Sequence, residues 1–354
     1  MMKQFNFLAE DSRLERLSKM GDPLEKLGEN IDFEQFRAII ERATIKPDKD
    51  LKKGGRPAFD AILMWKMSLL QEWYGISNDS VEYLINDRLS FQRFLGIGLN
   101  DKVPDANTLW DFKEALAKNG TDKELFEFFE KRMEGIGVIT RKGSIVDATF
   151  VDAPKQRNNR EENKEIKEGK IPDGWDDPEK ARFLAQKDTD ARWAKKGNET
   201  YFGYKDHVKV DADSKMIVSF EVTAASVHDS QTIVSLLDEK DEVVNADSAY
   251  VGEDLEREIR EKLDDEETGK KVILNINEKG YRNNPLTDEQ KAKNGEKNRV
   301  RARVEHVFGF MTVSMGGIFI RTIGMVRAKA GIARRNLAYN MKRFVFLTTK
   351  PKMA

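Results

Sequence analysis

The stretch GSIVDATFV, residues 143–151, decides the fold class of this 354-residue chain. Its β-branched and apolar residues predict a strand. Asp147 shares one face of that strand with Ile145, Thr149 and Val151, where an unpaired carboxylate is costly to bury. Either a structural salt bridge or a catalytic role would satisfy such a residue. The stretch therefore marks a central strand and a candidate site together.

The residues after this strand continue the pattern of a mixed sheet. Strands are predicted at 204–210, 216–222, 242–246 and 271–276, helices at 230–237 and 253–262, and a basic helix over 299–310. Three strands, a helix, a strand, a helix, a strand and a helix are the succession of an RNase-H-like fold. The segment at about 155–200 interrupts this order; it is dense in charge, contains several Gly and Pro, and is predicted to be a flexible excursion.

The residues before Gly137 predict helices instead. One is expected over 57–74, and a second follows the turn at 76–79 and continues to Ile85, so a helix-turn-helix pair can form. Capping boxes predict further helices that begin at Thr108 and Thr121. The length also favours two domains: an all-helical one over 1–136, for DNA binding or dimerisation, and an RNase-H-like mixed-sheet one over 137–350. Because such helix pairs also occur in proteins that never bind DNA, the role of the first domain stays open.

The composition limits the kinds of metal site that this chain can form. The chain has no Cys, which excludes disulfides and thiolate metal sites and fits a reducing cytoplasm. Its three His are too few for a His-rich centre, so a metal here would be a hard, oxygen-ligated cation. No apolar stretch reaches membrane-spanning length, and residues 1–6 do not open a signal sequence. We therefore expect a soluble, cytoplasmic protein without a membrane partner.

The formal net charge of −1 hides two opposite regions. Residues 292–343 carry twelve Lys or Arg against two Glu, a net of +10. Residues 238–267 carry fourteen Asp or Glu against four Lys or Arg, a net of −10. Because DNA responds to the local field rather than to the total charge, the basic region is a candidate DNA-binding surface.

Two further carboxylates complete the candidate site. Asp247 ends the apolar run VVNAD, where helix capping and ligand binding are both common roles. Glu305 lies one turn after Arg301 in the predicted basic helix, where an ordinary ion pair is the alternative. It is rotated about 100° from the apolar stripe of that helix, so it can reach along the sheet edge. Two strand carboxylates and one helix carboxylate are how an RNase-H-like fold holds two divalent cations.

Four blocks carry a family resemblance: VDATFVDAP (146–154), GYKDHVKVDADSKMIVSFEVTAASVHDSQ (203–231), NADSAYVGE (245–253) and RARVEHVFG (301–309). They resemble the blocks of bacterial insertion-sequence DDE transposases, with the insertion sequence 5 family as the nearest match. The stretch GRPAFDAILMWKMSLLQEWYGISNDSVEYLI (55–85) is similar to the helical region of that family. Its pattern places the DDE triad on Asp147, Asp247 and Glu305. The chain departs from the family signature at Asn298, where the family has Tyr, and at Thr312, where it has Lys.

The resemblance implies a Mg²⁺-dependent DNA transposase. Such an enzyme binds the terminal inverted repeats of its element, cleaves the DNA ends and joins the 3′ hydroxyls to target DNA. The three carboxylates would hold two Mg²⁺ ions, with Mn²⁺ as a possible substitute; such a pair serves both the attacking and the leaving oxygen. Because both element ends must be held together, a homodimer or larger assembly on double-stranded DNA, associated with the nucleoid, is implied.

Five side chains around Glu305 are candidates for contact with DNA phosphates: Lys297, Arg299, Arg301, Arg303 and His306. The alternative is a solvated helix face. Two other functions also fit the sequence. One is an RNase-H-like nuclease without strand transfer, and the other is a catalytically inactive, transposase-derived DNA-binding regulator.

Overall fold

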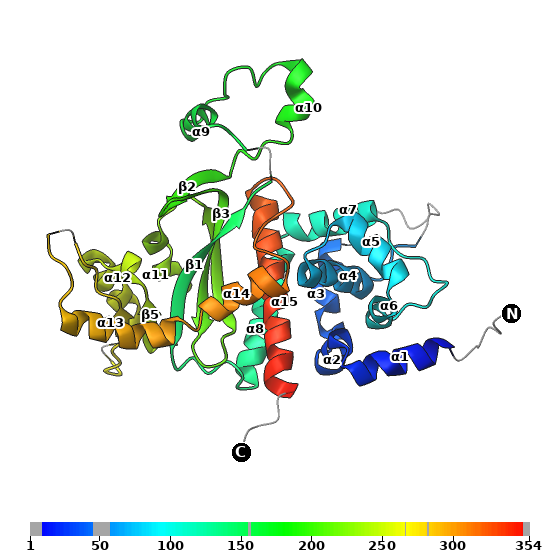
Figure 1. The fold of residues 1–354 in the computed structure, drawn as a ribbon, viewed down its shortest axis with the longest axis horizontal. Coiled ribbons are helices and arrows are strands. Elements are labelled where there is room, and N and C mark those ends of the chain that lie inside the picture. Colours follow the sequence, from blue (N-terminus) through cyan, green and yellow to red (C-terminus); the bar gives the residue numbers. More distant parts are fainter. Residues whose placement is uncertain (1–8, 45–56, 155–156, 266, 282, 350–354) are drawn as a thin grey trace. The chain divides into compact units, whose positions relative to one another are not determined.

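The computed structural model describes residues 9–44, 57–154, 157–265, 267–281 and 283–349 (Figure 1). Residues 1–6, which were predicted not to begin a signal sequence, lie outside this set. The chain forms two compact units, one of residues up to 125 together with those from 337 onward, the other of residues 126–336. The domain boundary expected after residue 136 stays a prediction, because compactness does not test independent folding.

The first unit is helical. Its helices are α1 (Ala9–Met20), α2 (Pro23–Asn30), η1 (Glu34–Phe36), α3 (Arg37–Thr44), α4 (Ala61–Tyr74), α5 (Asn78–Asp87), α6 (Leu89–Leu95) and α7 (Ala106–Lys118). Asp60 caps α4 by accepting hydrogen bonds from the amides of residues 62 and 63. The helix ends at Gly75, which has a φ of 62°. Trp65 and Trp73 of α4 are no more than 1 % exposed, so α4 is a core helix.

Helix α5 is the more exposed member of the predicted helix-turn-helix pair. Among its ten residues are three acidic side chains and no Lys or Arg. Phosphates repel such a helix, so α5 lacks the usual charge of a DNA-recognition helix. The predicted start of α7 at Thr108 is wrong: Asp105 is the cap, and its Oδ1 accepts the amide of Thr108 at 2.7 Å. Helix α8 (Thr121–Gly135) begins where it was predicted.

The second unit is built on a six-stranded mixed sheet. Its strands are β1 (Ser144–Asp152), β2 (Arg192–Lys196), β3 (Glu199–Asp211), β4 (Ile217–Ala224), β5 (Val243–Ala246) and β6 (Ile273–Ile276). The order along the sheet is β2-β3-β1-β5-β6, and β4 pairs with β3. β3 is antiparallel to β1, β2 and β4, whereas β5 is parallel to β1 and β6. All five predicted strands are present, and the architecture is RNase-H-like.

Helices cover the central strands. The predicted helix at 230–237 forms as two short pieces, η3 (Asp229–Gln231) and α11 (Ile233–Leu236), and the predicted helix at 253–262 is α12 (Glu253–Leu263). A buried cluster joins α11 and α12 to β1 and β5; its members include Ile233, Ile259, Val146 and Val244. Tyr250, which ends the short helix η4 (Ser248–Tyr250), belongs to the same cluster.

The predicted basic helix over 299–310 is two helices. α13 (Asp288–Arg301) stops, and α14 (Glu305–Ser314) begins after a turn at 302–304. α13 buries none of its residues, whereas Val304 and Val307 are fully buried. The chain must leave the direction of an exposed helix to bring Val304 into the core, so a single straight helix is excluded. α15 (Met325–Thr349) ends the described chain.

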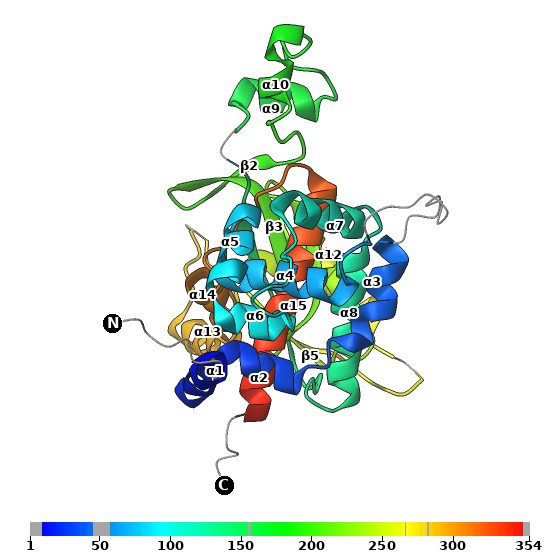
Figure 2. The same ribbon diagram turned by 90° about the vertical axis from the view of Figure 1, so that its right-hand side faces the viewer.

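The excursion is more ordered than predicted. It contains α9 (Arg160–Lys167), η2 (Pro178–Lys180), α10 (Ala181–Leu184) and strand β2, and α9 and α10 stand away from the sheet (Figure 2). Asn159 and Glu162 form a capping box at the start of α9. Asp188 is 1 % exposed and accepts hydrogen bonds from the hydroxyl of Tyr204 at 2.9 Å. The described part of this segment therefore contains helices and a strand that the prediction of a flexible excursion did not include.

Gly203 lies where β3 passes closest to the end of β1. A Cβ at this position would lie 2.1 Å from the carbonyl oxygen of Val151 and 2.8 Å from the amide of Ala153. Its φ of 156° is also one that other residues rarely adopt. The pairing of β1 with β3 at this point therefore requires glycine.

Candidate active site

Asp147 and Asp247 lie on neighbouring parallel strands. β1 and β5 pair with Ser144 opposite Val244 and Ile145 opposite Asn245. The same offset brings Asp147 level with Asp247, the residue that follows β5. Asp247 caps η4, because its Oδ1 accepts the amide of Ala249 at 2.7 Å. Parallel pairing thus unites two carboxylates separated by 100 residues, at the sheet edge where α/β folds bind ligands.

The two charges repel each other. Burial and, to a smaller extent, the negative charge of Asp247 raise the pKa of Asp147, while the amide of Ala148 and the guanidinium of Arg301 oppose the shift; the net result is a pKa of about 6. The raised pKa means that the folded chain holds this carboxylate without enough positive charge around it. A bound cation would supply the missing charge.

Arg301 contacts the first of these carboxylates, Asp147. Its Nη1 lies 3.4 Å from Oδ2 of Asp147, and its Nε donates to Oδ1 of Asn298 at 3.3 Å. Asn298 also accepts a hydrogen bond from the side-chain amide of Asn277 at 2.7 Å. The departure from the family at Asn298 therefore orients Arg301 toward Asp147. Thr312 is exposed and bonds back to the carbonyl of Phe308 within its own helix.

Glu305 is exposed at the first position of α14. Among the residues that the structure describes, no three acidic or histidine side chains lie close enough together to share a metal ion. The structure thus brings Asp147 and Asp247 together and does not bring Glu305 into a metal cluster with them. Its role as the third ligand stays a prediction.

The five predicted phosphate-binding residues divide into three groups, of which the first is Arg301, in contact with Asp147. Two form hydrogen bonds within the protein: Lys297 donates to the carbonyl of Ile276 at 2.7 Å, and Arg303 donates to the carbonyl of Ala212 at 2.7 Å. Two others, Arg299 and His306, are exposed. α13 is held to the protein by polar side chains, so its basic face is not used for core packing.

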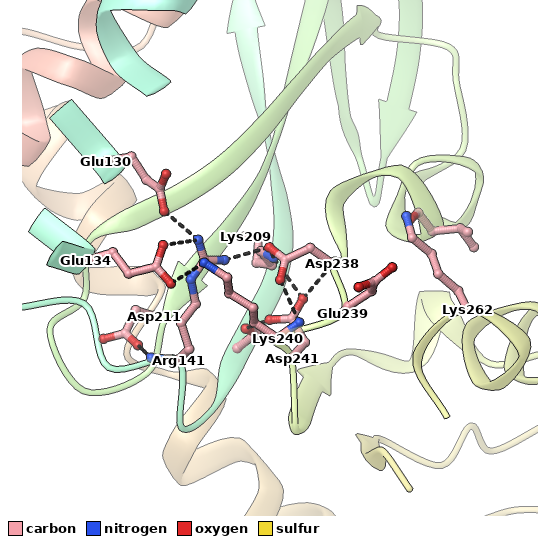
Figure 3. Close-up of polar contacts among 12 residues, drawn as sticks. Glu130, Glu134, Arg141, Lys209, Asp211, Asp238, Glu239, Lys240, Asp241 and Lys262 are labelled. Atoms are coloured by element: carbon pink, nitrogen blue, oxygen red, sulfur yellow. Dashed lines mark hydrogen bonds and ion pairs between the residues drawn. The ribbon is translucent and has the colours of Figure 1, made fainter. Parts of the chain in front are cut away.

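The opposite, amino-terminal end of the same strands holds a charge network that the sequence did not predict (Figure 3). Lys209 and Asp241 are fully buried and 2.8 Å apart, and Lys209 also contacts Asp238 at 2.7 Å. Arg141 bonds Asp238 at 2.6 Å and Glu130 of α8 at 2.5 Å. We call these five residues the basal network.

The basal network fixes the register that aligns the two aspartates. Ser144, the first residue of β1, donates a hydrogen bond to Asp241, which lies just before β5. The side chain of Asn245 returns a bond to the carbonyl of Ser144 at 3.0 Å. Lys209 pairs along the strands with Val146, next to Asp147. The only local signal in the sequence is that Lys209 stands between Val208 and Val210.

Hard oxygen donors of this kind fit a divalent cation such as Mg²⁺. Asp147 and Asp247 present two carboxylates at one strand edge, where burial and the charge of Asp247 raise the pKa of Asp147. His207 is buried with its Nε2 beside the hydroxyl of Thr223, and burial lowers its pKa to about 4, so its ring is neutral near pH 7. The residues present therefore fit a carboxylate-held cation.

Comparison with known families agrees with this geometry. The transposase DDE domain model matches residues 140–341, and a second transposase domain model, DUF772, matches residues 12–115. No solved structure matches the chain. Among the described residues, no helix is both long and apolar enough to cross a membrane.

Proposed function

Because this chain belongs to the family of transposases with a DDE domain, we propose that it cleaves the ends of a mobile DNA element and joins their 3′ hydroxyls to target DNA. One observation carries the proposal beyond the family: Asp147 and Asp247 are aligned at the ends of adjacent parallel strands. The raised pKa of Asp147 supports a site built to receive a cation.

In this proposal Asp147 and Asp247 hold Mg²⁺, with Glu305 as the third ligand and Mn²⁺ as a substitute. The bound cations would activate the attacking oxygen and stabilise the leaving oxygen. The chain itself contributes positioning. Parallel pairing fixes the carboxylates, and Asn298 holds Arg301 beside them, where its charge also suits a DNA phosphate.

Double-stranded DNA is the proposed partner, both as terminal inverted repeats and as target. Lys297, Arg299, Arg301, Arg303 and His306 would bind its phosphates. Two DNA ends must be held at once, so the protein would work as a homodimer or larger assembly on the cytoplasmic nucleoid. Since α5 is acidic, a dimerisation role suits that helix of the first 136 residues better than contact with phosphates.

A strand-joining assay tests the proposal. The purified chain is mixed with an end-labelled terminal-repeat duplex, a supercoiled plasmid and Mg²⁺, and labelled plasmid is the expected product. Asp147→Asn should abolish cleavage and joining, with a loss greater than the roughly 100-fold upper range of outer-shell partners, and leave DNA binding nearly intact. Asp247→Asn and Glu305→Gln should do the same. Activity of Asp147→Asn within about tenfold of the wild type would refute the assignment.

The exposed position of Glu305 favours a second candidate, a DNA-binding regulator without catalytic activity. Such a protein would bind the terminal repeat and give neither cleaved nor joined product with Mg²⁺ or Mn²⁺. A nuclease without strand transfer would give cleaved ends and no labelled plasmid. The same assay therefore separates all three functions.

A further inference from the structure

Tyr250 carries a hydroxyl group without a hydrogen-bond partner. It is 1 % exposed, and within the described part of the chain its hydroxyl belongs to the few buried polar side-chain atoms that no partner satisfies. Tyr250 ends the turn that Asp247 begins: its amide donates to the carbonyl of Asp247 at 3.2 Å. An unsatisfied buried group in a native structure calls for an explanation.

The groups around this hydroxyl are negative. Burial raises the pKa of Tyr250 well above its usual value of ten, and the charges of Asp229, Asp147 and Asp247 raise it further. The hydroxyl therefore keeps its proton and offers a hydrogen-bond donor. Asp229 lies on η3, which contacts η4, and already accepts a bond from Nζ of Lys205 at 2.7 Å.

The carboxylate of Asp147, in contrast, has few hydrogen-bond donors. It accepts one backbone hydrogen bond, from Ala148 at 2.8 Å, and touches Arg301 at 3.4 Å. Carboxylates that bind metal ions are usually held by additional donors, which orient the oxygens that do not face the metal. The strand register places Asp147 level with Asp247, and the amide of Tyr250 is bonded to the carbonyl of Asp247, so the buried hydroxyl and the partly buried carboxylate of Asp147 lie in one neighbourhood.

We propose that Tyr250 is a positioning residue for the carboxylate pair: its hydroxyl donates a hydrogen bond to the oxygen of Asp147 that faces away from a bound divalent cation. The role rests on the proposed function. The hydroxyl is too buried to touch DNA, so it acts through Asp147.

The test is Tyr250→Phe in the full-length chain, which removes one oxygen. If the hydroxyl were merely structural, its loss would change neither metal binding nor catalysis. We expect the metal-free Tm to stay equal or rise, because an unsatisfied polar atom is removed. The Kd for Mn²⁺, measured by calorimetric titration, should weaken by about 10- to 100-fold, and Mg²⁺-dependent cleavage should fall by a similar factor.

Tyr204→Phe is the matched control. The Tyr204 hydroxyl bonds both oxygens of Asp188, so its removal should lower the Tm and leave the Mn²⁺ affinity unchanged. A Tyr250→Phe protein with wild-type Mn²⁺ affinity would overturn the inference. Asp147→Asn in the same titration distinguishes an error in the metal site from an error in the role of Tyr250. If both variants bind Mn²⁺ like the wild type, the assignment of the metal site is wrong. If Asp147→Asn loses the metal and Tyr250→Phe does not, only the role of Tyr250 is wrong.

Discussion

The two ends of the strand pair β1 and β5 use similar side chains in opposite ways. At the amino-terminal end, Lys209 and Asp241 are fully buried and paired, and Ser144 adds a hydrogen bond to Asp241. At the carboxyl-terminal end, Asp147 and Asp247 repel each other, and the pKa of Asp147 rises to about 6. The two ends lie only a few residues apart along each strand.

This difference distinguishes a structural charge cluster from a candidate site. Buried charges that are paired and hydrogen-bonded fix geometry, here the register of two parallel strands. Partly buried charges of one sign that lie close together lower stability, and a protein retains them where a ligand completes them. The basal network thus holds in place a carboxylate pair that the folded chain leaves incomplete.

The largest expected effect on stability comes from breaking the basal network. Lys209→Met leaves Asp241 buried without its cation, and removal of one partner of a buried pair costs about 3–5 kcal/mol. Urea unfolding of the full chain should show a decrease of this size. Lys209→Met combined with Asp241→Leu should recover part of it, since no buried charge is then left unpaired.

Lys240→Met is the matched control for that prediction. Lys240 contacts Glu134 at 2.7 Å, yet its side chain is 61 % exposed, so its loss should cost no more than about 1 kcal/mol. Equal losses for the two lysines would show that burial does not set the strength of the network. The comparison between the two strand ends would then fail.

The next largest effect is a pH dependence of stability, caused by Asp147 at the carboxyl-terminal end of the strand pair. The pKa of Asp147 in the folded state, about 6, exceeds the ordinary 3.8, so the folded chain binds this proton more tightly than the unfolded chain. Stability from this group is present below pH 4 and is lost as the pH rises toward 6, by about 3 kcal/mol in total. Asp147→Asn should therefore be more stable than the wild type at pH 7, by up to that amount.

Unfolding of both proteins in the presence of a chelator, from pH 4 to pH 8, measures this difference. The advantage of Asp147→Asn should grow between pH 4 and 6 and then level off. A difference that is constant across the range would mean that Asp147 is as well satisfied as the charges of the basal network.

The smallest effect concerns the cations near the site. Arg299 is exposed, whereas Arg303 is bonded to the carbonyl of Ala212. Each phosphate contact contributes about −0.9 to the slope of log K against log salt, so Arg299→Gln should flatten the slope of DNA binding by about that much. Arg303→Gln should flatten it less. The reverse order would show that Arg303 leaves its carbonyl to bind DNA.

Much of the sheet could be predicted from the sequence, because β-branched runs such as that of β1 carry a strong local signal. The break between α13 and α14 could not. Residues 301–304 contain no Gly or Pro, and the chain turns there because Val304 enters the core while α13 stays outside it. The ordered excursion was also missed, although Asn159 and Glu162 form a capping box that was readable from their spacing.

The candidate site shows the same limit. Asp147 and Asp247 could be predicted as partners, since one lies on a recognisable strand, the other directly follows one, and the family pattern joins them. Lys209 was not singled out, because its partner Asp241 is 32 residues away and only the folded sheet brings the two together. Tyr250 was missed for a similar reason: an unsatisfied hydroxyl is a property of the packed structure, and no spacing in the sequence announces it.

Gly203 carries a consequence for how this chain tolerates change. Since even a methyl group there would lie 2.1 Å from the carbonyl oxygen of Val151, every substitution must push apart the strands β1 and β3. In a library of all single variants selected for transposition, position 203 should be as intolerant as Asp147, although glycine has no side chain to bind metal or DNA. Intolerance at a position is therefore no evidence of chemistry there, and a soluble-expression screen would separate the two residues: loss of folded protein at Gly203, and folded but inactive protein at Asp147.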